Sequence, residues 1–153
     1  MAIGDVIQEY GYRKGTRTLK TTTGCTKGYV LAYDTDGYSH ATQALRTAAP
    51  AYPFVVADET VVGPGSGQSE AKVIEEGVVE LPKVTGAIAK GQKVGISTTA
   101  GKVTAWTAPD APTAYAEAAM QAELDKLLFV VGEAHAAAAS GDTTVKVRLQ
   151  KVA

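Results

Sequence analysis

The chain reads Thr23-Gly24-Cys25-Thr26-Lys27-Gly28-Tyr29-Val30-Leu31 and continues with Asp34-Thr35-Asp36-Gly37. Roughly sixty residues later it reads Thr85-Gly86-Ala87-Ile88-Ala89-Lys90-Gly91-Gln92-Lys93-Val94, followed by Thr98-Thr99-Ala100-Gly101. Each copy has Thr-Gly, a short spacer, Lys-Gly, an apolar strand, and a Gly-ended turn before a second strand. Glycines at such spacing favour tight turns, and the apolar runs between them favour strands. The repeat therefore predicts two strand–turn–strand units, with no reactive side chain common to both.

Alternating and apolar runs outside the repeat predict further strands, and one segment predicts a helix. Residues 72–81 alternate well enough for a strand, with a bulge or bend at Gly77. A helix is predicted over residues 111–127, because apolar side chains recur there at helical spacing. They form a stripe on one face that is expected to pack against the rest of the protein. That stripe consists of Ala116, Met120, Leu124, Leu127 and Leu128. Strands are expected near residues 28–33, 38–44, 54–57, 72–81, 92–97, 102–107, 128–135 and 145–149.

These elements predict a mainly β protein, a compact β-barrel or sandwich-like domain with one α-helix inserted near residues 111–127. A chain of 153 residues is most simply one domain. Residues 23–153 are expected to form it. Residues 1–22 are expected to form an N-terminal arm, because Gly11, Gly15 and several basic residues argue against a compact element there.

Composition disfavours several classes of function. The net charge is −1 and the pI is near 6.1, without the basic excess of proteins that bind nucleic acid through its phosphates. Cys25 is the only cysteine, so neither a disulfide within the chain nor a cysteine-based zinc site can form. The first residues carry no pattern of a secretory signal, and no apolar run approaches the length needed to span a bilayer. A soluble protein without nucleic-acid or membrane partners is expected.

Motifs for phosphate, nucleotide or calcium binding fail on their spacing. The three glycines of residues 63–67 are too closely spaced for a dinucleotide fingerprint, and no helix is expected after them. Residues 24–28 place Lys before Gly and lead into a strand, unlike a phosphate-binding loop. The Asp34-Thr35-Asp36-Gly37 run opens like a calcium loop, but its twelfth position is Leu45, so a β-turn with an aspartate capping its own backbone is expected.

The side chains able to catalyse a reaction do not form a recognisable set. His40 and His135 lie in strand patterns without a neighbouring carboxylate at metal-ligand spacing. The sequence places neither histidine next to Cys25. Glu75 and Glu76 are adjacent in a strand and should point to opposite faces. No catalytic, cofactor-binding or metal-binding residue is expected, and no cofactor, so the chain is predicted not to be an enzyme.

The order of these units resembles a known family. The two Thr-Gly…Lys-Gly strand units, and the closing run Val131-Gly132-Glu133-Ala134 through Ala139-Ser140-Gly141-Asp142 to Thr143-Thr144-Val145-Lys146-Val147, are similar to small capsid decoration, or cement, proteins. These proteins belong to tailed bacteriophages and related viruses, and some members carried the label of predicted recombinases. The absence of a Walker motif argues against that label here. The resemblance covers roughly residues 20–108 and 128–150, and the segments 48–68 and 111–127 are less similar to the family.

The resemblance implies a β-tulip-type domain that forms a homotrimer on the outer capsid surface, bound to the major capsid protein. The protein would be made in the host cytoplasm and located in the virion. Contacts to the capsid or a neighbouring subunit are expected from two exposed segments, the basic N-terminal arm (residues 1–22) and the Gly-rich loop near residues 63–67. These contact residues are Arg13, Lys14, Arg17, Lys20, Pro64, Gly65 and Ser66. The alternative is a trimeric, surface-displayed module that binds a carbohydrate or receptor through exposed tyrosines, with Tyr10, Tyr12, Tyr29, Tyr33, Tyr38 and Tyr52 as candidates.

Overall fold

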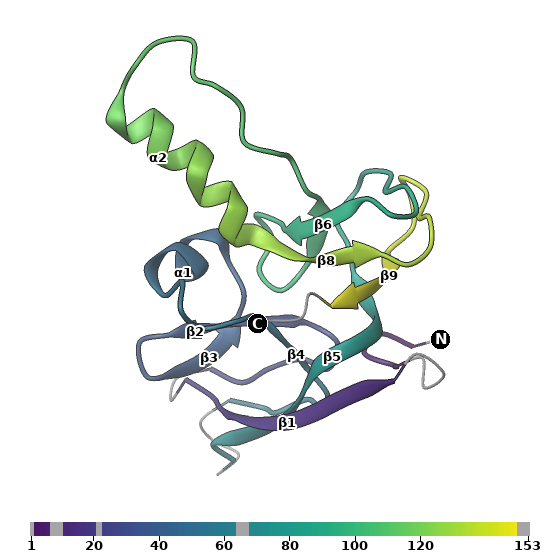
Figure 1. Cartoon of the computed structure of the whole chain (residues 1–153). Helices are drawn as coiled ribbons and strands as arrows, with labels where there is room; N and C mark the ends of the chain where they lie inside the picture. The colour runs from purple at the N-terminus through teal and green to yellow at the C-terminus, as the bar shows by residue number, and fades with distance from the viewer. Residues whose placement is uncertain (1, 7–10, 21–22, 64–67, 150–153) are drawn as a thin grey trace.

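The structure is a computed structural model that describes residues 2–6, 11–20, 23–63 and 68–149. Within these residues the chain is mainly β: nine strands form one curled, antiparallel sheet, and two α-helices accompany it (Figure 1). The predicted fold class is thereby confirmed. The elements are β1 (Tyr12–Thr18), β2 (Val30–Asp34), β3 (Gly37–His40), α1 (Gln43–Ala48), β4 (Val55–Ala57), β5 (Glu70–Pro82), β6 (Lys93–Ile96), β7 (Val103–Ala105), α2 (Glu117–Asp125), the 3-10 turn η3 (Lys126–Phe129), β8 (Val130–Ala134) and β9 (Thr144–Leu149).

The two sequence repeats form the two ends of the sheet. The strand order is β3-β2-β4-β5-β9-β8-β6-β7, with β1 paired to β5 beside this path. The first repeat supplies the β2–β3 hairpin and the second supplies the β6–β7 hairpin. Gly28 and Gly91 follow the repeated lysines with φ of +86° and +83°, a conformation that glycine adopts without strain. The prediction of two strand–turn–strand units is confirmed.

Strand β5 is the long central strand, and it changes partners near Gly77. Its first part pairs with β1 and β4, and residues 78–82 pair with β9. The register between β1 and β5 skips Glu75, which makes it the extra residue of a bulge. Gly77 has φ of +126°, and a Cβ there would lie 2.9 Å from the Cβ of Tyr12. The irregularity predicted at Gly77 is confirmed.

The sheet is buried on both faces where β2, β4 and β5 meet. Along β4, Val56 belongs to one apolar cluster, while Val55 and Ala57 belong to a second on the opposite face. Along β5, Val73 and Ile74 divide in the same way. Side chains of a strand alternate between faces, so a run of consecutive apolar residues is what a doubly covered strand requires.

Two expectations about the first half of the chain are wrong. The sequence predicts no compact element within residues 1–22, but Tyr12–Thr18 form strand β1 along the whole first part of β5. The polar composition of β1 reflects its position at an edge, where its side chains are mostly exposed. The strand predicted over residues 38–44 ends at His40, because the Thr42 side chain accepts a hydrogen bond from the Leu45 backbone N–H and starts helix α1.

The predicted helix at residues 111–127 is shorter than expected. Helix α2 begins at Glu117, and the chain from residue 107 to residue 116 forms an extended loop (Figure 1). Asp110 lies in this loop, where its carboxylate accepts a hydrogen bond from the neighbouring Ala111 N–H at 2.8 Å. Pro112 also disfavours the helical conformation in the residue before it.

Candidate interaction surface

Residues 107–129 project from the β domain, and we call this segment the arm (Figure 1). It consists of the extended loop, helix α2 and the turn η3. Two hydrogen bonds hold its base: the Trp106 indole N–H donates to the Lys126 carbonyl at 2.7 Å, and Arg46 Nε donates to the Leu128 carbonyl at 3.0 Å. Phe129 also packs against the core. The arm therefore has a fixed base.

Polar contacts within the arm join its loop to its helix. Glu123 accepts a hydrogen bond from the Asp110 backbone N–H at 2.9 Å and forms an ion pair with Lys126 at 2.6 Å. The hydrogen bond from Lys126, with the one from Asp110, lowers the pKa of the Glu123 carboxyl. Gln121 donates to Asp125 at 2.8 Å. The loop and the helix thus form one unit.

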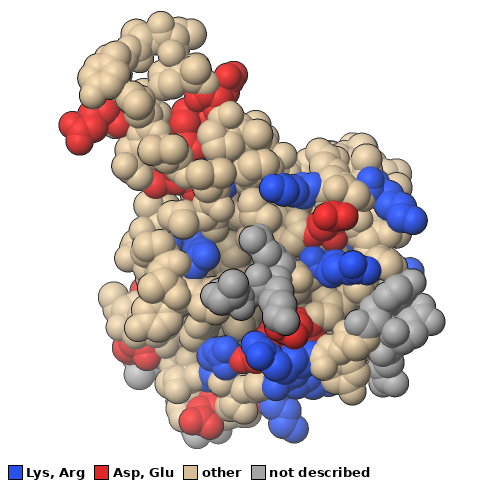
Figure 2. Space-filling view, viewed as in Figure 1, with Lys and Arg blue, Asp and Glu red and all other residues tan. Residues whose placement is uncertain are grey.

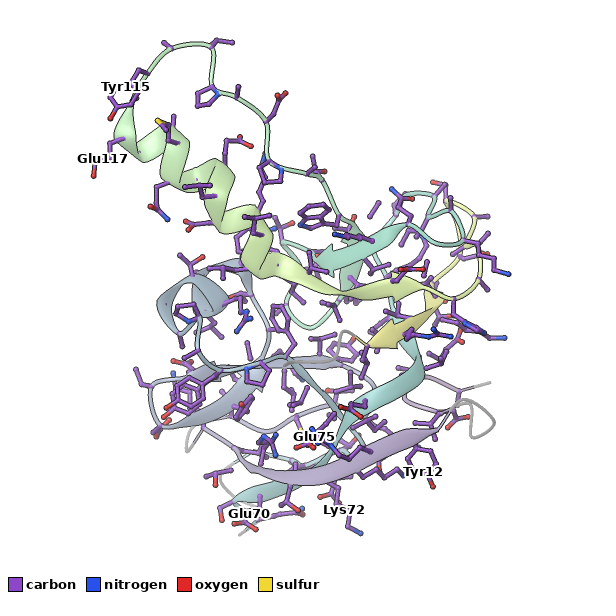
Figure 3. All side chains as sticks on the ribbon, in the orientation of Figure 1. Tyr12, Glu70, Lys72, Glu75, Tyr115 and Glu117 are labelled. Carbon is purple, nitrogen blue, oxygen red and sulfur yellow. The ribbon has the colours of Figure 1, made fainter. Side chains whose placement is uncertain are left out.

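The apolar stripe of the arm is exposed, which corrects the expectation that it packs against the protein. Met120, Leu124 and Leu127 are 41%, 54% and 57% exposed, and no residue of α2 is buried. Tyr115 is 85% exposed, and it lies near Glu117 at the far end of the arm (Figure 3). A nine-residue helix without tertiary packing is marginally stable in water. The stripe is therefore open to contact with another surface.

Two hollows lie at the base of the arm, and Trp106 lines both. One, of about 540 Å³, combines the apolar side chains of Leu127, Val130 and Leu149 with the basic side chains of Lys93 and Arg148. Glu133 is its acidic lining residue. We call this hollow the β8–β9 groove. The other, of about 430 Å³, lies on the α1 side and includes Gln43, Ala122 and Phe129.

The arm and the domain carry opposite net charges. The arm holds Asp110, Glu117, Glu123 and Asp125 against the single cation Lys126, which gives −3. The whole chain has a net charge of −1, so the remainder carries +2. Figure 2 shows acidic side chains on the projecting arm and basic side chains spread over the domain below it. An acidic, partly apolar projection thus stands on a weakly basic body.

The four basic residues predicted to reach a partner all form ion pairs within the chain. Arg13 lies 2.8 Å from Glu75, and Arg17 pairs with the other oxygen of the same carboxylate. Lys14 pairs with Asp58 at 2.9 Å and Lys20 with Asp34 at 2.6 Å. The hydrogen bond to Asp58 raises the pKa of Lys14, and the hydrogen bond from Lys20 lowers the pKa of Asp34. Arg13 and Lys14 remain 62% and 44% exposed at their side chains, so they still present surface to a partner.

The predicted loop contacts Pro64, Gly65 and Ser66 lie outside the described residues.

The expectation that Glu75 and Glu76 point to opposite faces of the strand is wrong in one respect. Arg13 lies within 3.9 Å of Glu76 as well as contacting Glu75, because the bulge at Glu75 interrupts the strict alternation of the strand. The two carboxylates are therefore partners of one arginine (Glu75 is labelled in Figure 3).

Cys25, His40 and Asp34 form hydrogen bonds that have a structural role. The Cys25 thiol is buried and donates to the Glu59 carbonyl at 3.3 Å, and burial raises its pKa. His40 Nε2 accepts a hydrogen bond from the Thr26 backbone N–H at 3.0 Å, and burial lowers the pKa of this histidine. The Asp34 carboxylate accepts from the Thr35 N–H at 2.8 Å, as the predicted turn requires. In the described part of the chain, no cluster of three or more His, Cys, Asp or Glu side chains is suited to hold a metal ion.

Sequence reasoning missed the groove and misassigned the stripe. Met120, Leu124 and Leu127 are visible as a helical pattern, but the pattern does not tell which surface covers it. Trp106, Lys93 and Arg148 come from three separate strands or strand ends, so their meeting depends on the sheet order.

No helix among the described residues is long and apolar enough to cross a membrane. Comparisons with protein-family models, with curated proteins and with solved structures find no match to this chain.

Proposed function

We propose that this chain is a structural protein of a virion that binds the outer surface of a capsid as a homotrimer and stabilises the capsid lattice. Its partner would be the major capsid protein, and its role would require no catalysis. The class of function comes from the resemblance of the Thr-Gly…Lys-Gly units and the closing β8–β9 run to capsid decoration proteins. The observation that carries the proposal is the exposed apolar stripe on a projecting arm.

The architecture supports this role in two ways. The β domain has a doubly buried central sheet, so it provides a firm base for surfaces that make contacts. The arm places Met120, Leu124 and Leu127 in water, which is costly for a protein that functions alone.

The alternative, a carbohydrate- or receptor-binding module, draws support from a smaller set of observations. Tyr12 and Tyr52 are each 45% exposed, and Tyr52 stacks on Tyr33 with ring centroids 4.0 Å apart. Tyr38 is buried against Tyr33, and Tyr10 lies outside the described residues. One face of the Tyr52 ring is thus already covered by Tyr33, which leaves a small platform for a sugar.

The test combines a mass measurement with capsid binding. Light scattering after size exclusion should give three times the chain mass of 15.8 kDa. The protein should then co-sediment with capsids built from the major capsid protein, and binding should raise the temperature at which those capsids open. A protein that is monomeric and never co-sediments would overturn the proposal. Retention on a glycan array without capsid binding would favour the alternative.

A point variant sharpens the test of the N-terminal contact. Deleting residues 1–20 would remove strand β1 from the sheet, so loss of binding would be ambiguous. Arg13→Ala with Lys14→Ala removes two half-exposed cations and keeps the backbone ladder. If the basic edge of β1 contacts the capsid, the double variant should stay trimeric and bind capsids more weakly, with the difference shrinking as salt is added.

A further inference from the structure

Helix α2 of the arm buries none of its residues against its own chain among the described residues. All residues of α2 are exposed or only partly buried, and the helix has no side-chain cap at its N-terminus. At nine residues it is shorter than helices that persist in water without packing. A surface that buries Met120, Leu124 and Leu127 would supply the missing stabilisation.

Charge decides between the two ways in which copies of this chain could supply that surface. If two arms packed against each other, a net −3 would face a net −3, which is repulsive. If an arm packed against the domain of another copy, the −3 would face a remainder that carries +2. The charges therefore favour contact between arm and domain.

The β8–β9 groove fits such an arm. Its volume of about 540 Å³ lies within the range of about 300 to 1,000 Å³ for pockets that bury a compact ligand. Its apolar lining by Val130 and Leu149 suits the leucines of the stripe, and Lys93 and Arg148 suit the carboxylates beside them. Leu127 is the arm residue that lines the groove, so an inserted arm would contact the domain and this apolar side chain, which is not one of the arm's carboxylates.

We propose that the arm of one copy inserts into the β8–β9 groove of a second copy, and that repetition of this contact closes the ring. The inference rests on the proposed homotrimer and names its interface. An arm-to-groove contact uses two different patches, so each copy offers one arm and one groove. Such a contact closes into a cyclic oligomer when the rotation between neighbours is suitable.

The experiment compares three variants of the full chain by light scattering and by dilution. Leu124→Glu places a charge in the stripe without touching the core, and it should weaken self-association at least about 30-fold. Lys93→Glu with Arg148→Glu reverses the charge of the groove and should act similarly. Val62→Glu is the matched control, because Val62 is 76% exposed and lies outside the arm, and it should associate like the unaltered chain.

Mixing the two defective variants tests the direction of the contact. The Leu124→Glu variant keeps its groove and the groove variant keeps its arm, so an equimolar mixture should form a heterodimer through one intact contact. Arm-to-arm packing predicts no such heterodimer. Trp106 is the only tryptophan and lines the groove, so its emission should shift on dilution of the unaltered chain and not in either variant.

The outcomes separate this inference from the proposed function. If Leu124→Glu stays trimeric, whether or not it still binds capsids, the inference is wrong and the capsid proposal stands or falls on its own assay. If the unaltered chain is trimeric, both variants are monomeric and the mixture gives a heterodimer, the inference is supported. Monomeric variants whose mixture stays monomeric would contradict the arm-to-groove contact.

Discussion

Replacing Glu75 by Gln should loosen strand β1, because this strand is attached with little apolar burial. Among the seven residues of β1, none has a buried side chain, and only Gly15 and Arg17 are partly buried. Its attachment to β5 therefore depends on the backbone ladder and on ion pairs. Glu75 is the partner of both Arg13 and Arg17 and is only 14% exposed.

The size of the effect follows from burial. Exposed ion pairs contribute about 0 to 1 kcal/mol, and hydrogen bonds to charged groups about 1.5 to 3 kcal/mol. The pair with Arg17, which is 28% exposed, should lie between these limits, while that with Arg13, 62% exposed, should add little. We expect Glu75→Gln to lower the free energy of unfolding by about 1 to 1.5 kcal/mol, which corresponds to about 2 to 6 °C in Tm.

Glu76→Gln provides the control at the next residue with the same chemical change. Glu76 is 31% exposed and lies 3.9 Å from Arg13, so its replacement should change the unfolding free energy by less than about 0.5 kcal/mol. Hydrogen exchange should show faster exchange in β1 for Glu75→Gln alone, and 1 M salt should reduce the gap between the variants. Equal losses from both replacements, or unchanged exchange in β1, would refute this account of the edge strand.

Three further changes have defined outcomes. In thermal unfolding, Gly28→Ala should lower the free energy of unfolding by about 2 to 4 kcal/mol and Gly91→Ala by about 1 kcal/mol. Both glycines have positive φ, but only a Cβ at Gly28 would clash with Ile3, so equal losses would contradict this. Asp34→Asn should make the free energy of unfolding depend less steeply on pH in the acidic range. Because Lys20 lowers the pKa of Asp34 below its usual 3.8, the carboxylate's contribution is present above that pH and disappears as the pH falls through the lowered value; urea titrations at several pH values check this. Cys25 should react with a thiol reagent on the order of 100-fold more slowly in the native protein than in urea, and rapid native labelling would refute its burial.

The parts of the fold that could be predicted are those that depend on neighbouring residues. The Lys-Gly turns, the Asp34 turn and the alternation in β9 are local signals, and the structure contains all three. Helix α1 was also accessible, because Thr42 is a favourable N-cap residue, but the predicted strand over residues 38–44 was extended across it.

The parts that could not be predicted depend on distant partners. Strand β1 consists mainly of polar and basic residues, and only its register against β5 shows why Arg13 and Arg17 converge on Glu75. The stripe of α2 shows the opposite difficulty. Helical spacing correctly predicts an apolar face, but it does not indicate whether the protein's own core or another surface covers it.

The central place of β5 has a consequence for how the chain folds as it is synthesised. Its partners β1 and β9 lie more than fifty residues away in opposite directions. The edge of residues 78–82 that faces β9 therefore has no partner until β9 leaves the ribosome, late in translation. Pairing between strands that are distant in the sequence is slow. During the delay, neighbouring nascent chains on one polysome expose the same unpaired edge of β5 to each other. The yield of folded protein during expression should therefore depend on chaperones that shield β5 during this interval.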